Sequence, residues 1–216
     1  MELKDRKDKV SYSIGVDIAR SFQRNETDVN VDMIARGMKD LLAGGSLLMT
    51  PEEMQEVFAQ VKSENAAKQQ AKREAQAEIN KIDGTVFLEK FGKAEGVNML
   101  PSGLLYQVIK EGAGRSPMPN ESVNVHYRGM FIDGTEFDSS YKRNEPTLFP
   151  VKGVIKGWTE ALQLMKEGSL WKIAVPPHLA YGETGTPGGP IGPNQVLLFE
   201  LEILQIIDTE QGLPTQ

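Results

Sequence analysis

Residues 51–91 limit the folds open to this chain more than any other segment. Thr50-Pro51-Glu52-Glu53 has the capping-box pattern, with proline at the first helical position. No further proline or glycine follows before Gly84, and a continuous helix would be roughly 60 Å long at ~1.5 Å per residue. Between residues 62 and 81 it consists mainly of alanine and of charged and amide helix formers. A helix that is polar all round usually bridges domains through solvent. The sequence therefore predicts two folded parts joined by a long helix, with Gly84 as its weak point.

Before this helix, residues 8–48 have the pattern of two short amphipathic helices. Asn30 is placed to cap the second helix, and Gly44-Gly45 to end it. About 40 residues rarely form an independent core, so a symmetric dimer that buries the apolar faces of both copies is expected. The alternative is that these helices fold back onto the rest of the chain. The two apolar faces comprise Val10, Ile14, Ile18 and Phe22 in the first helix, and Ile34, Met38, Leu41 and Leu42 in the second.

From about residue 92 onward the pattern changes to β strands. Strands are predicted at 104–109, 170–175 and 197–204, with a short helix at 159–166. One short helix against an antiparallel sheet is an α+β arrangement. The expected organisation is a helical dimerisation region (1–48), a connecting helix (49–92), an α+β domain (93–207) and a flexible tail (208–216). We expect a fragment from about residue 92 to fold alone.

Composition excludes several classes of function. The 216-residue chain has a formal charge of −6 and no basic run with interleaved aromatic residues, which argues against a nucleic-acid partner. It has no cysteine, and its two histidines, His126 and His178, are too isolated for a zinc site. We therefore expect no metal and no cofactor. No apolar stretch approaches the ~20 residues that a membrane helix needs.

Three short motifs carry the functional signal. Residues 123–140 read as a hairpin that turns at Asp133-Gly134 and returns through Phe137-Asp138-Ser139-Ser140. The second motif is Val154-Ile155 followed by Gly157-Trp158, and the third is Leu179-Ala180-Tyr181-Gly182. In order and spacing these runs resemble the FKBP-type peptidyl-prolyl cis-trans isomerases. The resemblance implies an antiparallel sheet wrapped on a short helix and an aromatic pocket that binds proline.

The resemblance also implies a role for individual residues. Trp158 would form the pocket floor, and Ile155 (through its N–H) and the Tyr181 hydroxyl would donate hydrogen bonds to substrate carbonyls. Asp138 would face the twisting carbonyl or orient its neighbours. Independently of the resemblance, Arg143 is expected to pair with a nearby carboxylate such as Asp138. Ile191 would lie on a loop that closes one side. The pocket set also includes Tyr127, Phe137, Val154, Ala180 and Phe199.

Residues 10–18, the long helix, and residues 100–106 and 188–194 are similar to one group within this family, the bacterial Mip, FkpA and FklB isomerases. This likeness implies a V-shaped homodimer through residues 9–48, whose substrates are unfolded or partly folded polypeptides that contain proline. It also implies sensitivity to macrolides such as rapamycin, and a place in the periplasm, the outer membrane or the cell surface. The alternative location is the cytoplasm.

Several alternatives remain for the pocket, for single residues and for the function. Two positions depart from single-domain relatives, Thr147 and Thr186, where aromatic or histidine side chains are common, so we expect a more open pocket and altered substrate preference. Phe137 and Phe199 could be ordinary core residues, and Asp138 could merely cap a turn. The chain could also act mainly as a non-catalytic chaperone that uses the same fold. An adhesion role rests on the likeness to Mip alone.

Overall fold

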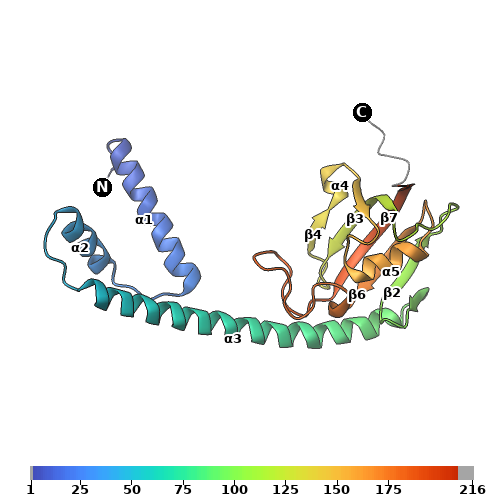
Figure 1. Ribbon diagram of the computed structural model, residues 1–216, viewed down its shortest axis with the longest axis horizontal. Coiled ribbons are helices and arrows are strands. Elements are labelled where there is room, and N and C mark those ends of the chain that lie inside the picture. Colours follow the sequence, from blue (N-terminus) through green and yellow to red (C-terminus); the bar gives the residue numbers. More distant parts are fainter. Residues whose placement is uncertain (1, 209–216) are drawn as a thin grey trace. The chain divides into compact units, whose positions relative to one another are not determined.

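The computed structural model describes residues 2–208 and divides into two compact units, Met1–Lys72 and Arg73–Gln216. Figure 1 labels the helices and strands of the two units. Residues 209–216, most of the expected C-terminal tail, lie outside the described residues. The mixed helix and antiparallel-sheet fold class is confirmed.

The first unit contains α1 (Arg6–Asn25), α2 (Val31–Leu42) and the beginning of α3 (Pro51–Gly92). Asn30 caps α2 as predicted, because its side-chain oxygen accepts hydrogen bonds from two backbone N–H groups of the first turn. The predicted capping box is also present. Thr50 N donates to Glu53 Oε2 at 2.8 Å, and Glu53 N donates to Thr50 Oγ1 at 3.2 Å. Neither α1 nor α2 has a buried residue, so within residues 2–208 much of their apolar faces remains exposed.

Helix α3 is continuous over 42 residues and does not break at Gly84. Gly84 is instead the one residue of α3 that is buried. A Cβ atom built there would lie 2.8 Å from Val196 Cγ2, closer than real contacts allow. The helix therefore does not end at Gly84, and the glycine allows α3 to pack closely against Val196 within the second unit.

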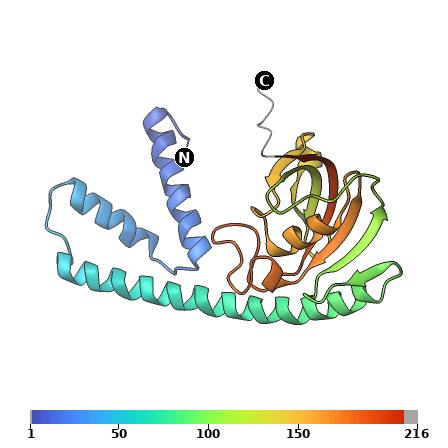
Figure 2. The same cartoon turned by 45° about the vertical axis from the view of Figure 1, so that its right-hand side comes forward.

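The second unit contains one antiparallel sheet in the order β1-β2-β6-β7-β3-β4, and β5 also pairs with β3. Each predicted strand is present within a few residues of its expected ends. The short helix α5 (Lys156–Leu164) begins three residues earlier than predicted, and Figures 1 and 2 show it against the sheet. The strands are β1 (Val97–Met99), β2 (Leu105–Lys110), β3 (Ser122–Met130), β4 (Glu136–Ser139), β5 (Thr147–Pro150), β6 (Leu170–Val175) and β7 (Leu197–Ile207).

Both faces of this sheet are covered. On one face α5 packs Trp158, Ala161 and Leu162 against a core that includes Val123 and Val125 of β3. The opposite face, formed by Leu105, Ala174 and Leu198, packs against three residues from the end of α3, which are Phe87, Leu88 and Phe91. The compact unit consequently starts at Arg73, inside the helix, whereas the division expected from secondary structure alone lies at 92/93.

The hairpin between β3 and β4 brings the pocket residues into register. Gly134 adopts a positive φ of 87°, and Asp133 Oδ1 accepts a hydrogen bond from Thr135 N at 2.8 Å. Only the glycine of this pair has positive φ, although both were expected to have it. Because Gly129 pairs with Asp138 across the two strands, the carboxylate lies beside the Tyr127 side chain. Behind β4, Ser139 caps the four-residue helix α4 (Ser140–Arg143), which carries Arg143.

Candidate active site

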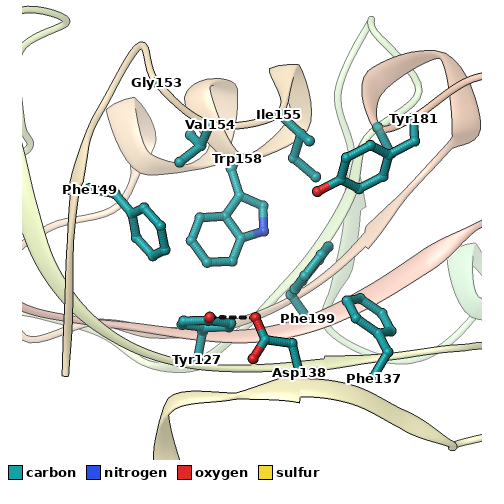
Figure 3. Close-up of a pocket in the computed structure, with 11 residues that line it drawn as sticks. Tyr127, Phe137, Asp138, Phe149, Gly153, Val154, Ile155, Trp158, Tyr181 and Phe199 are labelled. Atoms are coloured by element: carbon teal, nitrogen blue, oxygen red, sulfur yellow. Dashed lines mark hydrogen bonds between the residues drawn. The ribbon is translucent and has the colours of Figure 1, made fainter. Parts of the chain in front are cut away.

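A pocket of about 520 Å³ lies between the start of α5 and the sheet, and Figure 3 shows its lining. Nine of the eleven residues predicted from the sequence line it, while Ile191 and Arg143 do not. Two lining residues, Phe149 and Gly153, were not predicted. The nine are Tyr127, Phe137, Asp138, Val154, Ile155, Trp158, Ala180, Tyr181 and Phe199.

Trp158 lies at the centre of the pocket with only 4% of its surface exposed. Three aromatic rings stand nearly perpendicular to its indole, with centroids 5.2 to 5.6 Å away. Edge-to-face contacts of this kind favour one fixed ring orientation. The three rings belong to Tyr127, Phe149 and Phe199. The result is a rigid, apolar floor for a flat or puckered ring of a ligand.

Asp138, Tyr127 and Arg143 form a closed hydrogen-bonded triangle at one wall. The Tyr127 hydroxyl donates to Asp138 Oδ2 at 2.6 Å, and Arg143 Nη1 donates to Asp138 Oδ1 at 2.6 Å. Arg143 Nη2 also donates to the Tyr127 hydroxyl at 2.9 Å. The expected pairing of Arg143 with Asp138 is therefore present. Arg143 itself stands behind the wall, where it fixes the carboxylate and also stacks over the Tyr127 ring at 5.6 Å.

This triangle sets the charge of the site. Burial by itself would raise the pKa of Asp138, but the hydrogen bonds from Tyr127 and Arg143 outweigh it, and the pKa lies below its usual 3.8. Burial, followed by the hydrogen bond to the Asp138 carboxylate, raises the pKa of Tyr127. At neutral pH the pocket therefore holds an ionised carboxylate and a neutral phenol.

Hydrogen-bond donors are sparse and are aimed at the cavity. Figure 3 shows the Tyr181 hydroxyl pointing between Ile155 and Phe199, and Tyr181 remains 40% exposed. Ile155 is the N-cap residue of α5, and no side chain caps that helix start. The first N–H groups of the helix therefore have no side-chain acceptor, although Trp158 N donates to the Ile155 carbonyl. Within residues 2–208 the buried indole Nε1 of Trp158 also has no hydrogen-bond partner.

The remaining predicted positions lie elsewhere. Ile191 is on the expected loop, but its side chain is 6% exposed and packs into the main core. Its backbone carbonyl accepts a hydrogen bond from Thr186 N, so Ile191 stabilises the loop conformation and does not contact the pocket. Neither Thr147 nor Thr186 lines the pocket.

The two histidines both bond to groups away from the pocket. His126 Nδ1 lies 2.9 Å from the buried Ser140 hydroxyl, and His178 Nε2 lies 2.9 Å from the Ser102 carbonyl. Within residues 2–208, no three side chains of the metal-ligating types cluster together, and no helix is both long and apolar enough to cross a membrane.

Phe149 and Gly153 could have been found from local patterns. Strand β5 alternates half-buried and exposed positions, with Phe149 on the inner side. Gly153 ends the turn after this strand, and a Cβ atom there would lie 2.4 Å from Pro150 Cγ. A Pro-x-x-Gly turn before the Val154-Ile155 motif was the available signal.

The site contains no nucleophile paired with a general base. It combines an apolar aromatic floor, a fixed carboxylate and a few directed donors. Such a site can bind a neutral, apolar ring next to an amide and change the polarity that the amide experiences. It is suited to a reaction in which no covalent bond is made or broken.

The family comparisons agree with this geometry. Residues 113–204 match the family described as FKBP-type peptidyl-prolyl cis-trans isomerase. Residues 7–108 match the domain described as amino terminal to FKBP-type peptidyl-prolyl isomerase. Together the two matches span most of the chain, as the motif resemblance predicted.

Comparisons with individual proteins agree with the two family matches. The chain is 44% identical to the "Outer membrane protein MIP" of Legionella longbeachae, over 93% of this chain and 85% of the relative. It is 42% identical to the "Peptidyl-prolyl cis-trans isomerase Mip" of Coxiella burnetii, over 94% and 88% of the two chains. The crystal structure of FkpA from Escherichia coli superposes with a TM-score of 0.74 at 36% identity, over 95% of this chain and 99% of that chain.

Proposed function

The chain belongs to the FKBP-type peptidyl-prolyl cis-trans isomerase family, and we propose that the pocket around Trp158 accelerates Xaa-Pro isomerisation in client polypeptides. One observation carries the assignment of the site: Trp158 is held by three edge-on rings at the floor of a cavity beside an ionised Asp138. The cavity of about 520 Å³ is large enough for a proline ring and its flanking peptide groups.

The barrier to this reaction is electronic. Rotation about a peptide bond costs ~18–20 kcal/mol because resonance is lost, and exchange at proline takes tens to hundreds of seconds. In the twisted state the amide has lost much of its polarity. A site that binds the twisted amide better than either planar form lowers the barrier. The apolar floor formed by Trp158 and its neighbouring rings supplies this preference.

Asp138 adds a fixed negative charge. Its pKa lies below the ordinary value, so at neutral pH it has no proton to donate and does not act as a general acid. Both of its oxygens are already held by Tyr127 and Arg143. A carboxylate facing the substrate carbonyl oxygen disfavours the polarised planar amide more than the twisted one, which is electrostatic discrimination without proton transfer. Ile155 N–H and the Tyr181 hydroxyl hold the flanking carbonyls.

The direct test follows cis-to-trans exchange in a short Xaa-Pro peptide, with and without the protein, in the presence and absence of rapamycin. Acceleration that rapamycin removes, and that Trp158→Ala and Asp138→Leu each reduce sharply, supports the assignment. Acceleration that persists in both variants would place the activity elsewhere. An inactive, fully folded wild type would overturn the proposal.

Binding of unfolded clients is a second candidate function of the same chain. Large apolar side chains are exposed in the first unit, among them Met38, Leu42 and Phe58. We infer that part of this surface forms the homodimer through residues 9–48, and that the remainder contacts clients. Asp138→Leu separates the two functions, since it should abolish isomerisation and leave suppression of client aggregation largely intact. Equal loss of both would show that client binding also uses the pocket.

The inferred location is the bacterial envelope, supported by the relative described as an outer membrane protein. The alternative location is the cytoplasm. Fractionation of cells that express the native gene distinguishes the two locations. Recovery in the cytoplasmic fraction would exclude the envelope.

A further inference from the structure

The loop that follows Tyr181 is tied together by its own hydrogen bonds. Gly185 N donates to the Tyr181 carbonyl at 3.1 Å, and Thr186 N donates to the Ile191 carbonyl at 2.9 Å. At the far end of the loop, Asn194 N donates to the Gly182 carbonyl at 2.9 Å. The end of the loop is thus bonded directly to the residue after Tyr181. A displacement of residues 193–194 would therefore act on the backbone next to the residue that carries the pocket hydroxyl.

Helix α3 holds that same end of the loop. Asn80 Nδ2 donates to the Pro193 carbonyl at 2.7 Å in a partly buried contact. Asn80 is oriented by its own helix, because its Oδ1 accepts a hydrogen bond from Gln76 at 2.8 Å. In Figures 1 and 2 the orange-red loop after β6 lies alongside the green part of α3.

Three further contacts join the same two segments. Asn194 Nδ2 donates to the Ala77 carbonyl at 3.5 Å, and the Arg73 side chain donates to the Thr184 carbonyl. The close approach of Gly84 to Val196 brings the helix against the beginning of β7. All these residues belong to the second compact unit.

We propose that Asn80 is a positioning residue for isomerisation, acting through Pro193, Asn194 and Gly182 on the place of the Tyr181 hydroxyl. Asn80 does not line the pocket, so it has no contact with substrate. The long helix is therefore part of the catalytic apparatus as well as a connection. This inference rests on the proposed role of Tyr181 as a donor to the substrate.

Asn80→Asp is the sharpest test. The substitution keeps the size of the side chain and the acceptor used by Gln76, but it removes the donor and sets a carboxylate against the Pro193 carbonyl. Asn65→Asp is the matched control, because it makes the same charge change in the same helix within the first unit. Full-length proteins are compared in kcat/KM for a short Xaa-Pro peptide. We expect a three- to tenfold decrease for Asn80→Asp, about the size of one lost hydrogen bond, and no change for Asn65→Asp.

A double-mutant cycle with Tyr181→Phe distinguishes positioning from general stabilisation. If Asn80 acts through the Tyr181 hydroxyl, Asn80→Asp should have little further effect in a chain that already carries Tyr181→Phe. Amide exchange at Asn194 and Gly185 should become faster in Asn80→Asp, while exchange at Leu201 in β7 stays slow. Independent, multiplying effects on kcat/KM, or equally faster exchange at Leu201, would overturn the proposal, as would an unchanged rate.

The two proposals fail in different ways. If the wild type does not accelerate peptide exchange, the proposed function is wrong, and the exchange rates at Asn194 and Gly185 still report whether Asn80 holds the loop. If the wild type is active and Asn80→Asp is equally active, only the positioning role is wrong.

Discussion

The chemistry of the pocket depends most closely on Asp138 and on the residues that surround it. Its pKa is depressed in the folded protein, so the stabilisation it provides is fully present above the ordinary value of 3.8 and is lost as the pH falls through the lower folded value. Arg143 is one of the causes of this depression, after the hydrogen bond from Tyr127. The ionised state of the pocket therefore depends on a residue outside the lining.

We predict that Arg143→Gln moves the acid limit of isomerase activity to higher pH, because the Asp138 pKa returns toward its ordinary value. Activity at pH 7 should fall only about two- to fivefold, as for the loss of one charged hydrogen bond at a partly exposed site. The measurement is kcat/KM against pH. Lys142→Gln is the matched control, since it removes a neighbouring charge of α4 that pairs with Glu136. An unchanged acid limit in Arg143→Gln would contradict the role of Arg143.

At the scale of single residues the motifs were informative because FKBP-like spacing assigns side chains directly to one pocket. Phe149 was not predicted because its strand is only four residues long, and so short an alternating run does not show which site its inner side chains face. Ile191 was placed on the correct loop, but a loop sequence does not state which side chains turn inward. Whether a loop residue packs into the core depends on contacts with distant strands, which local pattern does not contain.

Among the elements, α3 is the one whose role the sequence described only in part. Its start, its length and its polar middle follow from capping and propensity. The packing of Phe87, Leu88 and Phe91 on the sheet was not expected, because a short apolar edge at the end of a helix does not indicate which element it packs against. The close approach at Gly84 was not expected for a related reason: a glycine in a helix can mark either flexibility or close packing, and the sequence does not show that Val196 lies beside it.

Gly84→Ala should destabilise the second unit even though alanine is the better helix former. The helix gains up to about 1 kcal/mol in propensity, but the new Cβ would lie 2.8 Å from Val196 Cγ2, and overpacking typically costs about 1–3 kcal/mol. We expect a net loss of about 1 kcal/mol in the free energy of unfolding by urea. A stabilised Gly84→Ala protein would show that the helix is free to move away.

For the whole molecule, the boundary of the catalytic part can be tested with fragments. A fragment of residues 73–216 retains the three α3 side chains that cover Leu105 and Leu198. A fragment of residues 92–216, the division expected from secondary structure, lacks Phe87, Leu88 and Phe91. Since these side chains are only partly buried, their loss should cost about 3 kcal/mol. We predict that the longer fragment isomerises short peptides at nearly the full rate and that the shorter one unfolds at lower urea concentration. Equal stability would contradict an integral role for the end of α3.

The apolar faces of α1 and α2 make the strongest prediction about assembly. No residue of either helix is buried within one chain, and burial of apolar surface is the main driving force for obligate association. Met38→Glu together with Leu41→Glu places charge on the face that a second copy would cover, so we expect light scattering to report a monomer where the wild type is a dimer. Leu164→Glu, at a residue of α5 that is exposed to the same degree as Met38 (48% against 47%), is the control and should remain dimeric.

The monomeric variant should keep its rate on short peptides, because the pocket lies wholly within the second unit. Its assistance to a proline-limited refolding protein should decrease, since two linked sites retain a long client better than one. A monomeric wild type, or a variant that stays dimeric, would exclude this face as the interface.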